Sequence, residues 1–184
     1  LYNSGVPADP NLVGSGPAHY FRMGEHASGT TIPDQSGNSS YDMTLTNGAA
    51  VVTDYPGYTP PSTKSVSHDG VDDYTYGALP RSVIESAFSV SVWAKYSSGQ
   101  GAASLFALNQ GDAGGGAYTG WGFGAMFIDF FNSGNARAYS RGSSGASDTS
   151  GSLPNLGDGN WHHIVYTADH TASADGTATV YIDG

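Results

Sequence analysis

The sequence predicts an all-β protein built as an antiparallel β-sandwich, and three observations lead to this prediction. Apolar and polar residues alternate with a period of two in several short runs, and no stretch keeps the spacing of a helix for three turns. Clusters of Gly, Asn, Asp and Ser separate these runs, as is typical of all-β proteins. With 184 residues, the chain is long enough for one domain with a substantial core.

The alternation defines a series of short strands. In chain order, we expect them at residues 18–24, 41–46, 49–53, 64–68, 72–76, 87–96, 103–109, 121–131, 135–141, 161–168 and 177–183. Residues 110–119 and 142–152 are rich in Gly and Ser and are expected to be flexible loops. Residues 1–16, which contain Pro7 and Pro10, are expected to be a linker.

The strand patterns also predict which side chains face the core. Period-two alternation in the run beginning at Phe88 puts on one face the side chains of Phe88, Val90, Val92 and Ala94. The last run likewise directs inward the side chains of Ala178, Val180 and Ile182. The stretch 121–131 is apolar on both faces, which is typical of a strand in the middle of a sheet. Two antiparallel sheets packed face to face would bury these stripes.

Several segments match the motifs of a known family in order and spacing. They are His19–Glu25, Gly29–Asn38, Ser67–Tyr74, Phe88–Trp93, Gly159–Val165 and Thr179–Gly184. Over roughly residues 18–184, the chain therefore resembles laminin-G-like (LamG) modules of the concanavalin A-like lectin/glucanase superfamily, which occur in tandem in bacterial surface and phage virion proteins. The resemblance implies a jelly-roll sandwich, frequently a bound calcium ion, and binding or scaffolding more often than catalysis.

The resemblance also implies a domain organisation. Residues 17–184 would form one laminin-G-like jelly-roll domain, incomplete at its C-terminus, because family members continue for several strands beyond a turn such as Tyr181–Gly184. Leu1–Asp9 is similar to the closing segment of such a module. We therefore expect residues 1–16 to be a linker or the tail of a preceding module.

Charge and composition exclude several classes of partner. Six Lys and Arg stand against sixteen Asp and Glu, for a formal net charge of −10. Neither a nucleic acid nor an anionic membrane surface could be neutralised by so few cations. The apolar runs are too short to cross a bilayer, so we expect no membrane insertion. Because the chain has no Cys, it has no disulfide, no thiolate zinc site and no cysteine nucleophile.

The residues required for catalysis are missing from the sequence pattern. Glucanases of the superfamily use two Glu in a Glu-x-Asp-x-x-Glu pattern, as nucleophile and acid. This chain has only Glu25 and Glu85, which lie sixty residues apart. There is no Gly-x-Ser-x-Gly elbow for a serine nucleophile. His162 and His163 are adjacent in a predicted strand, so their side chains must diverge. We therefore expect no enzyme activity and no catalytic residue.

Two acidic segments could hold a hard cation. Asp34 and Asn38 lie in a turn-rich loop, in the region from which modules of the resembled family often build a calcium site, and calcium prefers carboxylate and amide oxygens. The alternative is an Asx turn, in which these side chains bond their own backbone. In the second segment, Asp72 and Asp73 would point to opposite faces of a strand, so a β-turn at Asp69 is favoured over a metal site there.

Trp93 is the candidate ligand-binding residue. It lies on the polar face of its strand, where an exposed indole could stack against a sugar ring. The alternative is that Trp93 packs inside the protein or between sheets. The sequence does not decide between the two.

These observations predict a non-catalytic binding or structural module of a larger extracellular or virion protein, such as a phage capsid decoration or tail-fibre protein. It would mediate adhesion or assembly, and its partners would be other copies, scaffold or capsid proteins, or surface glycans. The alternative is a calcium-dependent glycan-binding lectin domain of a secreted or cell-surface bacterial protein. A glycoside hydrolase is the least favoured class.

Overall fold

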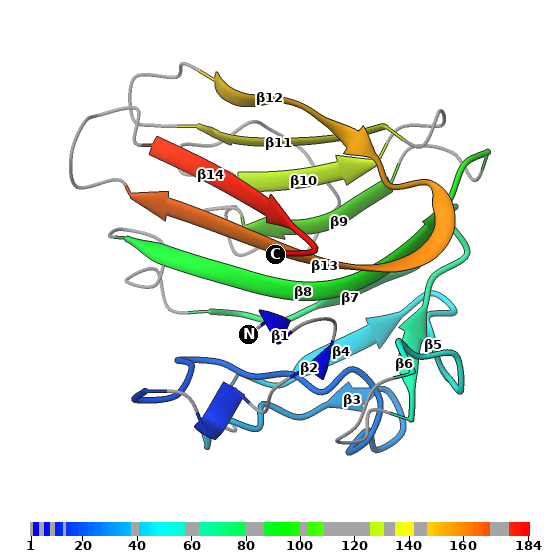
Figure 1. Cartoon of the computed structure of the whole chain (residues 1–184). Coiled ribbons are helices and arrows are strands. Elements are labelled where there is room, and N and C mark those ends of the chain that lie inside the picture. Colours follow the sequence, from blue (N-terminus) through cyan, green and yellow to red (C-terminus); the bar gives the residue numbers. More distant parts are fainter. Residues whose placement is uncertain are drawn as a thin grey trace. The chain divides into compact units, whose positions relative to one another are not determined.

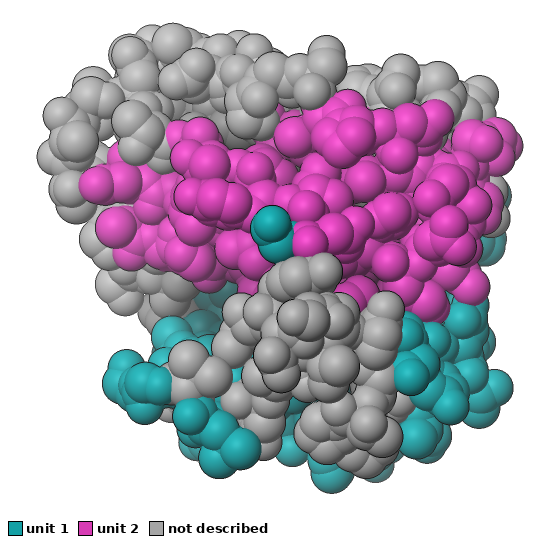
Figure 2. Space-filling view, viewed as in Figure 1, with its two compact units in different colours: residues 1–79, 184 teal, residues 80–183 magenta. Residues whose placement is uncertain are grey.

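The chain is an all-β protein with antiparallel sheets, as the sequence predicts. A computed structural model describes residues 2–3, 6–7, 10–12, 14–37, 41–57, 63–79, 87–99, 103–108, 126–130, 135–141, 147–169 and 177–184. The chain divides into two compact units, one of residues 1–79 with residue 184 and one of residues 80–183 (Figure 2).

The first unit contains seven short strands and one 3₁₀ turn among its described residues. They are β1 (Tyr2–Asn3), β2 (Val6–Pro7), η1 (Pro10–Leu12), β3 (Thr31–Ile32), β4 (Met43–Thr46), β5 (Ala50–Val52), β6 (Ser65–Ser67) and β7 (Tyr74–Tyr76). The strands pair as β1-β2, β3-β4-β7 and β5-β6. Ile32 and Leu45 are buried, on strands that pair side by side. Across the described residues, no helix has the length and apolar character to cross a membrane.

The second unit contains the longer strands. They are β8 (Phe88–Ser97), β9 (Ala103–Leu108), β10 (Met126–Phe130), β11 (Asn135–Arg141), β12 (Ser147–Asn155), β13 (Asp158–Asp169) and β14 (Thr177–Ile182). They form a four-stranded sheet of order β12-β11-β10-β9 and a three-stranded sheet of order β14-β13-β8 (Figure 1). Strand β10 pairs on both sides, so the prediction of a central strand within residues 121–131 is confirmed for the part that the structure describes.

The core of the second unit lies between these two sheets. Its buried residues come from both sheets, with Ala94, Ile164 and Tyr166 on one and Ala136 and Ala138 on the other. The apolar faces predicted for β8 and β14 pack against this cluster. Their side chains are those of Phe88, Val90, Val92, Ala178, Val180 and Ile182. The predicted alternation is therefore confirmed, and this unit is a two-layered β-sandwich.

The strand predicted at residues 18–24 is wrong. Within it, Phe21 makes only an isolated bridge, to Asp34. The Tyr20 amide donates to the Asp34 carboxylate instead of to a neighbouring strand. At Gly24, the backbone turns sharply with a φ of 131°, a conformation that residues with a Cβ rarely adopt. Side-chain capping and this turn replace the ladder that the sequence pattern suggested.

The loop predicted at residues 142–152 is also wrong, because β12 begins at Ser147 and joins the four-stranded sheet. Its pairing with β11 is interrupted by two register shifts. Ser, Gly and Asp have low strand propensity, but backbone pairing to a neighbouring strand overrides such local preferences. The other predicted loop, at residues 110–119, lies outside the described residues.

Candidate functional site

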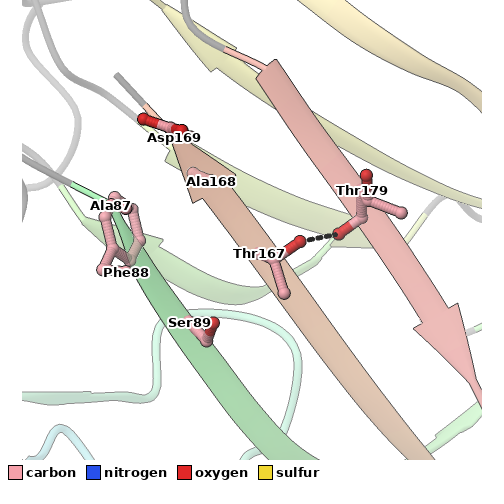
Figure 3. A pocket seen from close by; sticks show the side chains of 7 residues that line it. All are labelled: Ala87, Phe88, Ser89, Thr167, Ala168, Asp169 and Thr179. Carbon is pink, nitrogen blue, oxygen red and sulfur yellow. Dashed lines mark hydrogen bonds between the residues drawn. The ribbon is translucent and has the colours of Figure 1, made fainter. Parts of the chain in front are cut away.

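A pocket of the second unit lies at one end of the three-stranded sheet and has a volume of about 330 Å³. Figure 3 shows its lining, which consists of Ala87, Phe88, Ser89, Thr167, Ala168, Asp169 and Thr179. The three strands β8, β13 and β14 all contribute. The pocket therefore exists only because strands from distant parts of the chain pair in one register.

A row of three hydroxyl groups crosses the pocket. Ser89 is opposite Thr167 on the neighbouring strand, and Thr167 is opposite Thr179. Residues opposite each other in a sheet share a face, so all three hydroxyl side chains lie on the same side. The Thr167 hydroxyl donates to the carbonyl oxygen of Thr179 at 3.4 Å, which leaves its oxygen able to accept a further hydrogen bond (Figure 3).

Asp169 and Phe88 also belong to the lining. Asp169 follows Thr167 on β13 and is half-buried. The Phe88 ring lies beside that of Tyr166, with centroids 6.4 Å apart and an angle of 27° between planes. Phe88 therefore packs on the core face, and the hydroxyls and the carboxylate are the groups suited to hydrogen-bond a ligand that has hydroxyl groups.

Trp93 does not line this pocket. It lies on the same face of β8 as Ser89, four residues further on, or about 13 Å along a strand. Its ring is stacked on that of His163, with centroids 5.1 Å apart. His163 is buried, and its Nε2 lies 2.9 Å from the Ser91 hydroxyl. The half-buried indole thus has a packing partner, and the ligand-binding role of Trp93 stays a prediction.

Asp34 is a buried carboxylate that accepts hydrogen bonds from three residues. Its Oδ1 accepts hydrogen bonds from the backbone amides of Tyr20 at 3.0 Å and Ser36 at 2.9 Å. Its Oδ2 lies 2.7 Å from His19 Nδ1. Burial opposes ionisation, but these hydrogen bonds outweigh it and lower the pKa of Asp34. The bond to Ser36 is an Asx turn, the alternative that the sequence left open.

A calcium ion at Asp34 would have to compete with these donors for both carboxylate oxygens. Asn38, its proposed partner, lies outside the described residues. The calcium site stays a prediction, and a calcium titration of the wild type and of Asp34→Asn, followed by the melting temperature, tests it. A calcium-dependent rise that the substitution removes would support the site. If calcium does not raise the melting temperature of the wild type, Asp34 has only the structural role of these hydrogen bonds.

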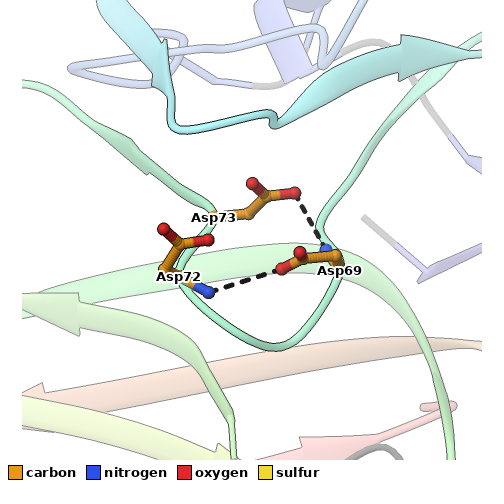
Figure 4. A group of neighbouring side chains, drawn as sticks. All are labelled: Asp69, Asp72 and Asp73. Carbon is orange, nitrogen blue, oxygen red and sulfur yellow. Dashed lines mark hydrogen bonds between the residues drawn. The ribbon is translucent and has the colours of Figure 1, made fainter.

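The second acidic cluster gathers Asp69, Asp72 and Asp73, whose carboxylate oxygens lie within 4.8 Å of one another (Figure 4). Strand β7 begins at Tyr74, so the expectation that Asp72 and Asp73 diverge on a strand is wrong. The Asp69 amide donates to the Asp73 carboxylate, and Asp69 itself accepts from the Val71 amide. The chain bends at residues 70–72, and the Asp69 and Asp73 carboxylates close this bend; the β-turn at Asp69 stays a prediction.

The pocket residues were not identified from the sequence. Alternation places Ser89 and Thr179 on the outward faces of their strands, and that is the only signal for them. The register between β8, β13 and β14 brings them together, and register depends on tertiary packing.

Comparison with known proteins identifies one family. A family model described as the concanavalin A-like lectin/glucanases superfamily matches residues 69–184, which include every residue of the pocket. No curated protein and no solved structure matches the chain.

Proposed function

The chain belongs to the concanavalin A-like lectin/glucanase superfamily, and from that premise we propose that it is a non-catalytic binding module of a larger extracellular or virion protein. Domains of this laminin-G-like kind generally bind or support structure and are typically extracellular. We propose further that the module mediates adhesion by binding a surface glycan.

The pocket on β8, β13 and β14 carries this proposal. Its three aligned hydroxyls and the Asp169 carboxylate offer hydrogen bonds to sugar hydroxyls. The described lining contains no cation, and the chain has a net charge of −10. Electrostatics therefore disfavours sulfated or otherwise acidic glycans and favours neutral ones.

The carboxylates support a role without catalysis. Hydrolysis of a glycoside with retention needs two carboxyl groups about 5–5.5 Å apart. The described pocket lining has one, Asp169. Glu25, the single Glu among the described residues, accepts hydrogen bonds from the backbone amides of Thr63 and Lys64. That arrangement gives Glu25 a structural task, and Glu85 lies outside the described residues.

Binding to an array of neutral and acidic glycans, followed by titration of the best ligand, tests the proposal. We expect Thr179→Val, which removes one hydroxyl at nearly constant volume, to weaken binding about fivefold to tenfold. Asp169→Asn should weaken it by at least about tenfold, because hydrogen bonds to charged groups are stronger. Both variants should retain the wild-type melting temperature within a few degrees.

Thr53→Val is the matched control, because Thr53 is exposed and lies outside the pocket. It should bind like the wild type. If no glycan binds, or if all three variants bind equally well, the pocket is not the binding site. Self-association of the chain in the absence of glycan binding would instead favour the assembly role.

A further inference from the structure

His162 lies between two carboxylates at the opposite end of the three-stranded sheet from the pocket. Its Nδ1 is 2.8 Å from Asp183 Oδ2, and its Nε2 is 3.1 Å from Asp158 Oδ1. The imidazole side chain is 16% exposed, whereas the two carboxylates are nearly half exposed. Each ring nitrogen therefore has one carboxylate partner, in a partly water-excluded position.

The contact with Asp158 depends on an irregularity in β13. Four residues of a regular strand span about 13 Å, too far for Asp158 and His162 to touch. The register of β13 against β8 shifts between Asp158 and Trp161, and Gly159 has a φ of 79°. The Asn160 amide donates to Asp158 Oδ1 at 2.8 Å, which closes an Asx turn. The turn folds Asp158 back towards the ring.

The contact with Asp183 is fixed by the turn that follows β14. Asp183 follows β14 and has a φ of 55°, which marks a turn. Its amide donates to the carbonyl oxygen of His163 at 2.9 Å. Its Oδ1 accepts from the His163 amide at 2.9 Å, while Oδ2 faces His162. The carboxylate thus joins the backbone of β13 to the imidazole.

These contacts determine the charge of the ring. An ionised carboxylate can only accept hydrogen bonds, and a neutral imidazole has a single N–H to donate. Both contacts are hydrogen bonds only when both ring nitrogens carry a proton, so the geometry selects the imidazolium ion. Burial opposes this charge, but the hydrogen bonds that the ring donates to Asp183 and Asp158 outweigh it and raise the pKa of His162.

The other charged groups nearby do not face the ring. On β8, the residue opposite His162 is Ala94. Lys95 is on the other face of the sheet, with its Nζ 5.8 Å from the Trp161 ring. His163 also faces away, and burial lowers its pKa. Asp158 and Asp183 are therefore the groups that control the protonation of His162, and Asp158 itself has a pKa lowered to about 2, chiefly by its bonds to Asn160.

We propose that His162 is a pH-sensitive clamp, whose imidazolium ion holds the Asp158 turn and the Asp183 turn to the same edge of the sheet. Because the pKa of His162 is raised, the stabilisation is complete below the ordinary histidine pKa of about 6.5. It is lost as pH rises through the raised value. The neutral ring keeps one donor, so one of the two turns is released.

NMR titration of the imidazole nitrogens, with parallel hydrogen exchange, tests the clamp. In the wild type, we expect His162 to titrate above an ordinary histidine, with both nitrogens protonated below its midpoint. Asp183→Asn and Asp158→Asn should each bring the pKa of His162 part of the way back to the ordinary histidine value. Protection of the His163 amide, which reports on the Asp183 turn, or of the Asn160 amide, which reports on the Asp158 turn, should fall about tenfold relative to the Tyr166 amide as His162 loses its proton.

Asp169→Asn is the matched control, because Asp169 is on the same strand and does not touch His162. It should leave the His162 midpoint in place. A midpoint at or below that of an ordinary histidine would overturn the proposal, as would a midpoint that neither Asp183→Asn nor Asp158→Asn changes. Protection ratios that do not depend on pH at either amide would show that the ring is a static contact and not a clamp.

Discussion

Replacing Ile164 with alanine is expected to lower the free energy of unfolding of the second unit by about 2–5 kcal/mol. Ile164 is fully buried in the core between the two sheets. Truncation removes apolar surface and leaves a cavity that close-packed neighbours fill poorly. Urea unfolding, followed by tryptophan fluorescence and circular dichroism, measures the loss as a lower midpoint with an unchanged slope.

Val165→Ala is the matched control for this prediction. Val165 is the next residue on β13, is half-buried and faces away from that core. Shortening it should cost roughly 1 kcal/mol, because fewer buried methyl groups are lost. Equal losses in the two variants would mean that the alternation of β13 does not define the core.

Replacing Asp34 with alanine is expected to destabilise the first unit by about 3 kcal/mol. The carboxylate has no exposed surface and accepts from His19 and from the amides of Tyr20 and Ser36. Removing it leaves these half-buried donors without an acceptor, and each such donor costs up to roughly 1–3 kcal/mol, with partial relief from water. Thermal unfolding of the variant should show the loss as a lower melting temperature.

Acid denaturation gives a second readout of the Asp34 network. The pKa of Asp34 is lowered in the folded chain, so its ionisation stabilises the fold above the ordinary aspartate value of about 3.9. This contribution disappears as pH falls through the lowered pKa. Asp34→Asn should therefore be less stable than the wild type at neutral pH, with a difference that shrinks in acid.

Asp72→Asn is the control for Asp34. Asp72 is exposed and lies close to two other carboxylates. Neutralising it relieves repulsion, so stability should stay unchanged or rise slightly. A loss as large as that of Asp34→Ala would assign the acidic cluster a structural importance that its exposure does not suggest.

The local sequence pattern was sufficient to predict which side chains face the core wherever apolar and polar residues alternate regularly. The runs at β8 and β14 encode their own inward faces, because successive side chains in a strand point to opposite sides. The same reasoning predicts that the side chains of His162 and His163 lie on opposite faces of their strand. The pattern failed at residues 18–24, where the backbone amide of Tyr20 bonds the Asp34 carboxylate in place of a strand. It failed again at β12, where pairing with β11 compensates for poor strand formers.

The candidate sites depended on information that local pattern does not contain. In the sequence, Ser89 lies more than seventy residues before Thr167, and Thr167 lies twelve residues before Thr179. Only the register of the three strands aligns the three side chains. His162 meets Asp158 through a shift in register that begins at Gly159. No spacing rule for a regular strand would place those two side chains in contact.

The sequence by itself determined the class of this protein. Its two-residue periodicity, its turn residues, its lack of cysteine and its excess of acidic residues define an all-β chain, and its ordered motifs identify the superfamily. The tertiary structure decided which polar residues meet. Periodicity fixes the face on which a side chain lies, whereas the pairing of strands and their irregularities fix its neighbours, and a site is made of neighbours.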